Sequence, residues 1–572
     1  MGISDCPCMG RCPRWAHCRR YRRGHARDYW PFGAWRTEMI RYPDFIRKYA
    51  YQRPDWRATH FEGRDYSWAQ MNRRVHAIAW QLEKLGVKPG DRVAYLGLNS
   101  HWIVEIYVVP SMIGAISVPI NHRLSVEEMV GVIGDATPAI LIFDRHFHEQ
   151  AADLLAQCPS LQTLILADWD QPADDLPDGT LHYDTLIAEA PAVADNAFDE
   201  SASRSDDTMI LFYTSGTTGQ PKGVMLSHSN FLVNATGSGH LYGYRQDDVL
   251  LLSGPLFHLG TGSRVFTALA YGTTMVVQPK FEVVDTLRMI EAQKITTMTM
   301  VPTMLNMVMN HPRFPEFDFS SIRVLTYGAS PMPVTLMERA IAAIPGITFC
   351  QGYGLTETSP VLSVLEPADH IPGNPMLDKL STVGRPILYS DLRIVDADDN
   401  PVPTGTPGEI VVRGPQVMNG YWNRPQETAH AMRGGFFHTG DAGVMDADGY
   451  LTIAGRTKEM IISGGENVYP IETENALSKH PAVAQAAVFG VPHAKWGEMV
   501  YAAVALHDGK PASEDELIAF CRERIAHYKA PRGMTIWQGP LPLSATNKLD
   551  KMTIKAQVLA SQGSEYTKEA AT

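Results

Sequence analysis

The hydrophobic positions from Met39 onwards recur at two spacings, one typical of amphipathic helices and the other typical of buried strands. Ser67 precedes a segment whose apolar residues follow the helical period through Leu82, and a serine in that place predicts a helix N-cap. Such alternation of helices and apolar runs predicts an α/β fold with helices packed on mostly parallel sheets. The apolar runs predicted to be strands lie at residues 93–98, 116–120, 135–143 and 161–167.

The pattern becomes richer in strands after residue 383. Turn sequences at 398–400 and 403–405 interrupt the apolar runs, which predicts a β-rich subdomain. The last part of the chain predicts a compact α+β unit, because apolar strands and amphipathic helices follow one another there. Its predicted strands lie at 483–491 and 499–506, Pro470 suits the first turn of one helix, and Ser513 begins the capping box of another.

The composition of the 572-residue chain narrows the classes of function. It is 45% hydrophobic and 20% charged, as in ordinary globular proteins, and its length suggests about three or four structural units. The formal net charge of -12 argues against a nucleic-acid scaffold, whose affinity depends on neutralising phosphates. The best candidate for a membrane span, Ile103 to Ile120, contains Glu105 and Pro110 and therefore predicts core helix and strand.

Residues 1–38 form a basic extension that is rich in arginine and cysteine. Cys6, Cys8, Cys12 and Cys18 lie there, whereas the other three cysteines are scattered and suit a reducing cytoplasm. The extension could be a metal knuckle, although it lacks the paired Cys-x2-Cys spacing of most zinc sites. It could be a basic targeting arm, although it lacks the apolar core of a secretory signal. We favour a third reading, an extended gene start upstream of a true initiator at Met39.

The strongest candidate for chemistry is the stretch from Tyr213 to Gly223, which follows the apolar run 209–212. Its glycines permit tight turns that bring backbone N–H groups close to an anion, and its serine and threonines add hydroxyl donors. Lys222 adds a positive charge. The stretch is not a Walker A loop, because Pro221 precedes the lysine and Gly223 replaces the final hydroxyl residue. These residues predict a holder for a polyphosphate.

Further polar residues lie where predicted strands end. The strand beginning at Ile347 opens at residue 351 into a glycine-rich octet, in which Tyr353 offers a flat ring for a purine and Glu357 an oxygen for Mg²⁺. Asp441 follows a tight turn and could accept both hydroxyls of a ribose. His258 stands beside leucines, where a histidine is more often a core residue than a catalytic one.

These motifs, in this order, resemble the signatures of the adenylate-forming superfamily, which includes acyl-CoA synthetases, peptide-synthetase adenylation domains and beetle luciferases. The match extends from about Met39 to Lys551. The resemblance implies a large N-terminal domain at 39–455, a hinge at 456–458 and a small mobile α+β C-terminal domain at 459–560, followed by a tail at 561–572. It also implies a reaction in which a carboxylate attacks ATP to give an acyl-adenylate and pyrophosphate, after which a thiol displaces AMP.

The resemblance assigns roles to individual residues. The catalytic residues are Lys548, Glu357 and His258, and Mg²⁺ is held by Thr214 and Glu357. ATP and CoA are bound by Thr214, Ser215, Gly216, Thr217, Thr218, Gly219, Lys222, Gly328, Gln351, Gly352, Tyr353, Gly354, Thr356, Asp441, Arg456, Lys458, Gly464 and Gly465. The chain departs from many members in having Asn547 before the lysine and Ile462 where some carry a second lysine, and Lys551 is a nearby competitor for the catalytic role.

The acid is expected to be hydrophobic, with a fatty acid as the main interpretation and an aryl or alicyclic acid as the alternative. Small residues at Gly260, Gly262, Gly328 and Ala329 predict an open acyl pocket, and no buried cation for a second carboxylate is evident. The chain ends soon after the last motif, which favours free CoA as the acceptor. An acyl-AMP ligase that loads a carrier protein and a non-catalytic sensor remain the alternatives. We expect a cytoplasmic protein, and peripheral membrane contact and a homodimer stay open.

Overall fold

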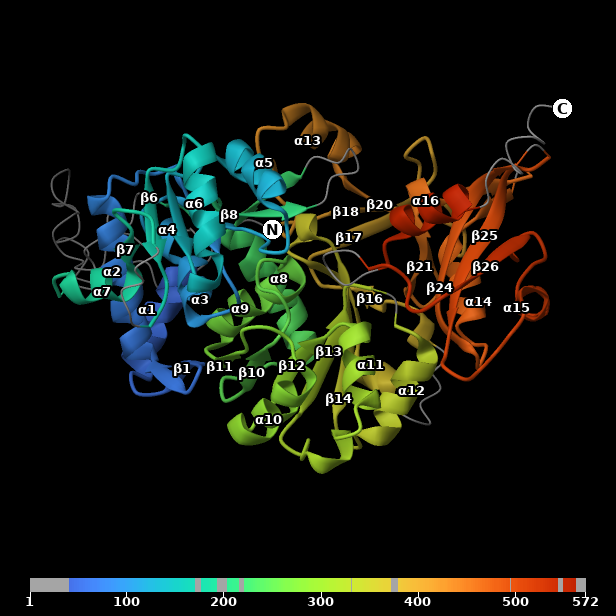
Figure 1. Ribbon diagram of the computed structural model, residues 1–572, viewed down its shortest axis with the longest axis horizontal. Helices are drawn as coiled ribbons and strands as arrows, with labels where there is room; N and C mark the ends of the chain where they lie inside the picture. The colour runs from blue at the N-terminus through green and yellow to red at the C-terminus, as the bar shows by residue number, and fades with distance from the viewer. Residues whose placement is uncertain are drawn as a thin grey trace, which may run out of the picture. The chain divides into compact units, whose positions relative to one another are not determined.

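The computed structural model describes residues 41–169, 176–192, 203–214, 221–330, 332–371, 379–464, 466–493, 495–543 and 549–561 (Figure 1). The predicted extension at 1–38 and the predicted tail, apart from Ser561, lie outside the described residues. No helix in the described part is long and apolar enough to cross a membrane.

The first sheet has eight strands in the order β19-β9-β8-β4-β3-β5-β6-β7. The strands from β8 to β7 run parallel to their neighbours, whereas β9 and β19 add an antiparallel edge. Their bounds are β3 Arg92–Leu96, β4 Ile116–Pro119, β5 Ile140–Phe143, β6 Thr163–Leu166, β7 Leu181–His182, β8 Thr208–Thr214, β9 Lys222–Ser227 and β19 Gly420–Tyr421. The four apolar runs of the first half are therefore confirmed as strands of one parallel sheet.

The second sheet has nine strands in the order β16-β15-β14-β13-β12-β10-β11-β1-β2, and its centre is also parallel. Antiparallel pairs close both edges, β1 with β2 and β14 with β15 and β16. The bounds are β1 Arg57–Phe61, β2 Arg64–Ser67, β10 Val249–Leu252, β11 Thr274–Val277, β12 Thr297–Met300, β13 Val324–Gly328, β14 Thr348–Gly354, β15 Val361–Leu365 and β16 Arg385–Pro386.

Helices cover these two sheets and share a large apolar core with them. Phe231 of α8 and Phe266 of α9 stack in this core with ring centroids 3.9 Å apart, beside Phe212 of β8 and Leu250 of β10. Ser67 caps α2 as predicted, and its hydroxyl accepts the N–H of Gln70. The helices are α1 Tyr42–Gln52, α2 Trp68–Lys84, α3 His101–Ile106, α4 Val109–Met112, α5 Val126–Ala136, α6 His148–Gln157, α7 Tyr183–Glu189, α8 His228–Tyr242, α9 Leu259–Tyr271, α10 Val283–Gln293, α11 Pro302–Asn310, α12 Val334–Ala343 and α13 Pro425–Ala431.

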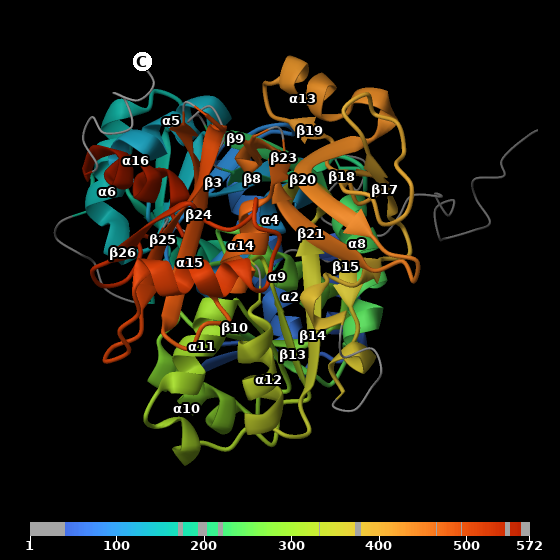
Figure 2. The ribbon, with the colours of Figure 1, turned by 90° about the vertical axis from the view of Figure 1, so that its right-hand side faces the viewer.

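The predicted β-rich region is an antiparallel sheet of four strands, whose members lie side by side in Figure 2. They are β17 Asp391–Val395, β18 Gly408–Arg413, β20 Phe437–Met445 and β21 Leu451–Arg456. The last part of the chain is α+β, as predicted, with a separate apolar core. It contains β22 Ile461–Ser463, β23 Glu466–Val468, α14 Pro470–Leu477, β24 Val483–His493, β25 Gly497–Leu506, α15 Glu514–Arg522, β26 Gly533–Trp537 and α16 Lys551–Ser561. The predicted fold class is thereby confirmed.

Candidate active site

The phosphate-loop candidate joins two antiparallel strands. Thr214 ends β8 and pairs with Lys222, which begins β9, and the next helix, α8, does not begin until His228. The intervening residues, which include Ser215, Gly216, Thr217, Thr218 and Gly219, lie outside the described residues. The strands on either side of the loop are therefore antiparallel neighbours, whereas in a Walker site the loop joins a strand to a helix.

Lys222 and Glu357 lie around one tyrosine that the sequence analysis did not single out. The hydroxyl of Tyr421 donates to Oε1 of Glu357 at 2.9 Å, and the Nζ atom of Lys222 lies 5.2 Å from the centre of the Tyr421 ring. Lys222 also pairs with Glu427 at 2.6 Å. Burial raises the pKa of Glu357, and the Tyr421 hydroxyl and Arg456 oppose that rise. Tyr421 comes from the short edge strand β19, which carries no motif.

Asp441 holds a second group of predicted site residues together. Its Oδ2 accepts the hydroxyl of Tyr353 at 2.7 Å, and its Oδ1 pairs with Nε of Arg456 at 2.9 Å. Neighbouring strands bring the groups together, because Asp441 in β20 lies opposite Arg456 in β21. Lys458 follows in a short 3₁₀ turn, and its pKa is lowered by burial and by the positive charges of Arg456 and Lys222.

The glycines of the octet serve close packing within the protein. A Cβ on Gly328 would lie 2.2 Å from the carbonyl oxygen of Gly352, and one on Gly354 would lie 1.7 Å from that of Pro360. The sequence predicts that the chain leaves the strand at residue 351. That prediction is wrong, because β14 continues through Gly354 as the antiparallel partner of β15. Thr356 follows in a 3₁₀ turn with Glu357.

His258 caps α9. Its Nδ1 accepts the N–H of Gly260 at 3.1 Å, so a neutral ring carries its proton on Nε2. The Cβ position of Gly260 lies 3.2 Å from that Nδ1 and 3.9 Å from Cβ of Ala329, so the start of α9 lies beside the end of β13.

The four small residues do not all leave space for the predicted acyl pocket. At Gly262, a Cβ would lie 2.6 Å from the Tyr107 hydroxyl, and at Gly328 it would meet Gly352. The expectation is wrong for these two glycines, because protein atoms already fill the space. No buried cation for a second carboxylate was expected, and the structure does show one buried cation on α9, since Arg264 is only 5% exposed.

A titratable cluster supports the turn in front of Asp441. Ligand-type atoms of Asp399, Glu409 and His438 lie within 4.8 Å of one another. The guanidinium of Arg433 pairs with Asp399 at 3.1 Å and with Glu409 at 3.2 Å, so an arginine already supplies the positive charge that a metal ion would bring. Oε1 of Glu409 accepts the N–H of Gly440 at 3.1 Å. We therefore assign the cluster to the support of the turn.

The C-terminal part of the predicted site is only partly described. The N–H of Gly464 donates to the carbonyl of Trp496 at 2.8 Å, while Gly465 and Lys548 lie outside the described residues. Lys551, the competitor of Lys548, pairs with Glu474 at 2.8 Å and with Glu459 at 3.1 Å. These partners engage the ammonium group of Lys551.

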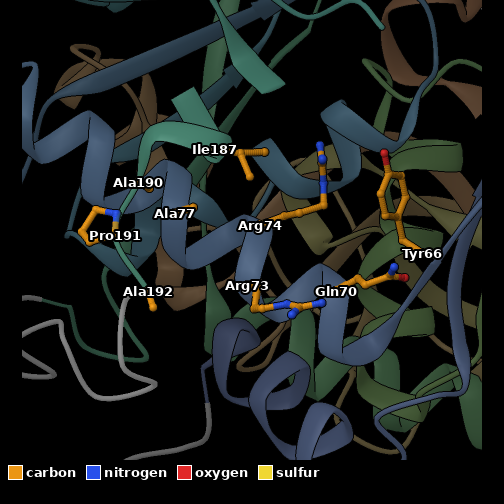
Figure 3. Close-up of a pocket in the computed structure, with 9 residues that line it drawn as sticks. All are labelled: Tyr66, Gln70, Arg73, Arg74, Ala77, Ile187, Ala190, Pro191 and Ala192. Atoms are coloured by element: carbon orange, nitrogen blue, oxygen red, sulfur yellow. The ribbon is translucent and has the colours of Figure 1, made fainter. Parts of the chain in front are cut away.

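A cavity of about 380 Å³ lies between α2 and the end of α7, away from these residues (Figure 3). Its lining contains none of the residues predicted to bind ATP, CoA or the acid. The lining residues are Tyr66, Gln70, Arg73, Arg74, Ala77, Ile187, Ala190, Pro191 and Ala192.

Comparison with known proteins identifies the family. The model of the AMP-binding enzyme family matches residues 46–422, and the model of the AMP-binding enzyme C-terminal domain matches residues 472–548. The chain is 37% identical over 503 residues to a feruloyl-CoA synthase of Amycolatopsis sp., covering 88% of this chain and 96% of that protein. It is 35% identical over 525 residues to an indoleacetate–CoA ligase of Aromatoleum aromaticum, covering 92% and 99%.

A solved structure agrees with this result. The o-succinylbenzoate CoA synthetase of Bacillus subtilis, in complex with ATP and magnesium ion, superposes with a TM-score of 0.76 at 31% identity, covering 89% of this chain and 99% of that one. The chain therefore belongs to the AMP-binding enzyme family, and the resemblance to adenylate-forming enzymes is confirmed.

Proposed function

We propose that the protein joins an aromatic carboxylic acid to CoA in two steps. The carboxylate oxygen attacks the α-phosphorus of ATP and pyrophosphate leaves, and the CoA sulfur then attacks the acyl carbon and AMP leaves. The observation that carries the proposal is the high coverage by relatives that are named as ligases of aromatic acids with CoA. These relatives favour the aryl alternative over the fatty acid that we took as the main interpretation.

The described residues offer groups that fit a nucleotide. Gln351 is buried, and its Oε1 has no hydrogen-bond partner among the described residues, so it can accept from an amino group of a purine. The Asp441 carboxylate, held by Tyr353 and Arg456, can accept ribose hydroxyls. Burial of Asp441 and Gln351 makes their hydrogen bonds to a ligand stronger than in water.

Glu357 also fits the predicted Mg²⁺ ligand. It is a carboxylate near the end of β14, with one oxygen engaged by Tyr421, and hard oxygen ligands suit Mg²⁺. When bound, Mg²⁺ would neutralise phosphate charge. Glu357 and Thr214 would hold the ion, Lys222 would contribute charge near the phosphates, and the Tyr421 hydroxyl would orient the Glu357 carboxylate.

The domain boundaries and the hinge at 456–458 belong to the same proposal. Lys458 follows Arg456 directly after β21, where the antiparallel sheet ends. We propose that rotation there exchanges Lys548, which would bridge the carboxylate and the α-phosphate, for the segment at Gly464 and Gly465, which would line the path of CoA.

The test is pyrophosphate release from ATP with a panel of aryl, alicyclic and fatty acids, with and without CoA. We expect aryl acids to give the highest kcat/KM and CoA to be consumed with AMP release. A higher kcat/KM for fatty acids would restore the first interpretation of the substrate. Acyl-AMP that never turns over with CoA would show a ligase that serves a carrier protein. Absence of pyrophosphate release with every acid would contradict the proposal.

The variant Lys548→Ala tests the division of labour. Loss of a cation that stabilises developing charge should lower adenylation on the order of 10²–10³-fold, while thioester formation from supplied acyl-AMP stays largely intact. Lys551→Ala is the matched control, because its ammonium group pairs with two glutamates and has no assigned role. If Lys551→Ala lost adenylation and Lys548→Ala kept it, the two assignments would have to be exchanged.

A further inference from the structure

Arg264 is a buried cation that no carboxylate neutralises within the described part of the chain. It lies on α9, is 5% exposed, and its Nε has no hydrogen-bond partner among the described residues. Its charge interacts with the side chains of Tyr242, Tyr244 and Cys350, and its guanidinium carbon lies 4.9 Å from the centre of the Tyr242 ring. An ionised group buried without a counter-ion is costly, so this position calls for a further partner.

The groups around Arg264 do not carry the missing negative charge. Burial raises the pKa of Tyr242 to about 12, although Arg264 lowers it in part, and burial raises the pKa of the Cys350 thiol. Both side chains are therefore neutral at physiological pH. The hydroxyls of Tyr242 and Tyr244 are also buried, and the Arg264 guanidinium donates a side-chain hydrogen bond to each of them. Three groups that can donate hydrogen bonds lie close together, and the carboxylate, which only accepts them, is the complementary group.

The position of Arg264 connects it to the predicted acyl site. Arg264 follows Gly260 by four residues on α9, so that the two share a helix face, and Gly260 lies beside Ala329 and the His258 ring. On the other side, the hydroxyl oxygen of Tyr242 would lie 2.2 Å from a Cβ on Gly352. The Arg264 cation thus lies one helical turn from Gly260, which is beside the predicted catalytic residue His258.

We propose that Arg264 is a specificity-determining residue, which binds a second carboxylate at the far end of the acid substrate together with the hydroxyls of Tyr242 and Tyr244. The inference rests on the proposed function and narrows its substrate to aryl acids with a distal carboxylate. The guanidinium can form two parallel hydrogen bonds to that group. A substrate without it leaves the buried donors unpaired, which lowers its kcat/KM.

Three matched acids test the inference: 4-carboxycinnamate, 4-hydroxycinnamate and cinnamate, each with ATP, Mg²⁺ and CoA. We expect wild-type kcat/KM to be highest for 4-carboxycinnamate. In Arg264→Gln the ratio of kcat/KM for 4-carboxycinnamate over cinnamate should fall on the order of tenfold to a hundredfold, with a smaller fall in Arg264→Lys. Arg288→Gln, which removes an exposed arginine from α10, is the control and should leave the ratio unchanged.

Tyr242→Phe provides a second variant, which removes one donor while the ring remains. It should lower the same ratio several-fold. Wild-type enzyme that uses cinnamate as well as 4-carboxycinnamate, or a ratio that Arg264→Gln leaves unchanged, would overturn the inference. Equal wild-type preference for 4-hydroxycinnamate and 4-carboxycinnamate would overturn the assignment of a carboxylate. Failure of the proposed function looks different, because then no acid in the panel supports pyrophosphate release.

Discussion

Two arginines are buried on helices of this protein, and they differ in what surrounds them. Arg74 on α2 is 7% exposed and Arg264 on α9 is 5% exposed. The guanidinium of Arg74 pairs with Glu105 of α3 and with Asp184 of α7, each at 2.5 Å. Among the described residues, Arg264 interacts instead with the side chains of Tyr242, Tyr244 and Cys350, none of which is a carboxylate. The two arginines are thus about equally buried, but only Arg74 is paired with carboxylates.

The contrast separates a structural cation from a candidate binding cation. The pairs of Arg74 recover part of the cost of burying charge and tie three helices together. The cavity of Figure 3 borders Arg74, whose charge is already paired with Glu105 and Asp184, so Arg74 itself has no comparable need for an anion. At Arg264 a bound carboxylate, as proposed above, would offset the free-energy cost of burying the charge. In this protein, the absence of a carboxylate partner at a buried arginine is therefore a better guide to a binding site than the cavity is.

Glu105→Gln should have the largest effect of the changes that test this contrast. The substitution keeps the shape of the side chain but removes the charge that pairs with Arg74, and breaking a buried pair typically costs about 3–5 kcal/mol. Asp184 remains as a second partner, so we expect a loss of about 3 kcal/mol in the free energy of unfolding, at the low end of that range. Urea denaturation followed by tryptophan fluorescence measures it.

The control for this variant is Glu291→Gln, which changes an exposed glutamate of α10 in the same way. It should alter the free energy of unfolding by less than about 0.5 kcal/mol. If Glu105→Gln changed the free energy of unfolding as little as the control does, the ion pair with Glu105 would not stabilise Arg74. The contrast between Arg74 and Arg264 would then be contradicted.

Arg264→Met should change stability in the opposite direction. Methionine has a similar length and fills irregular space, and it removes a buried charge that lacks a counter-ion. We expect the free energy of unfolding to rise by about 1 kcal/mol, since apolar replacements of buried charges are often stabilising. A loss of 3 kcal/mol or more in the same denaturation experiment would mean that the protein's own groups satisfy Arg264, as they do Arg74.

Local sequence patterns predicted the helices and strands of this fold better than they predicted which strands pair with one another. The cap at Ser67 and the parallel strands of the first sheet follow from residues close in sequence, where spacing and side-chain type suffice. The extension of β14 through Gly354 was missed, because it depends on pairing with β15 beyond a turn. The hairpin β8–β9 likewise appears only once Thr214 is seen to pair with Lys222.

The candidate site shows the same limit. The motifs predicted Asp441, Glu357 and Lys222, but not Tyr421, which comes from a two-residue edge strand and contacts two of them. The two arginines could not be told apart by sequence, since each lies within an apolar helical pattern. The carboxylate partners of Arg74 lie 31 and 110 residues away along the chain, and only folding shows that the partners of Arg264 are neutral side chains.

The last prediction concerns pH at Arg74. His101 touches this arginine, and its pKa lies well below the usual value because of burial and the positive charge of Arg74. The unfolded chain therefore binds a proton near pH 6.5 that the folded chain refuses, so stability is complete above pH 6.5 and is lost as the pH falls below it. Between pH 7.5 and 5.5 the loss should be about 1 kcal/mol.

His101→Phe isolates this contribution, because phenylalanine keeps a ring between Tyr66 and Trp169, on which His101 stacks. The free energy of unfolding of the variant should fall less between the two pH values, by about 1 kcal/mol. The buried Glu105, whose raised pKa has the opposite sign, is present in both proteins and cancels in the difference. Equal pH dependence in wild type and variant would mean that His101 accepts its proton in the folded state, and that the pairing of Arg74 leaves room for a second positive charge.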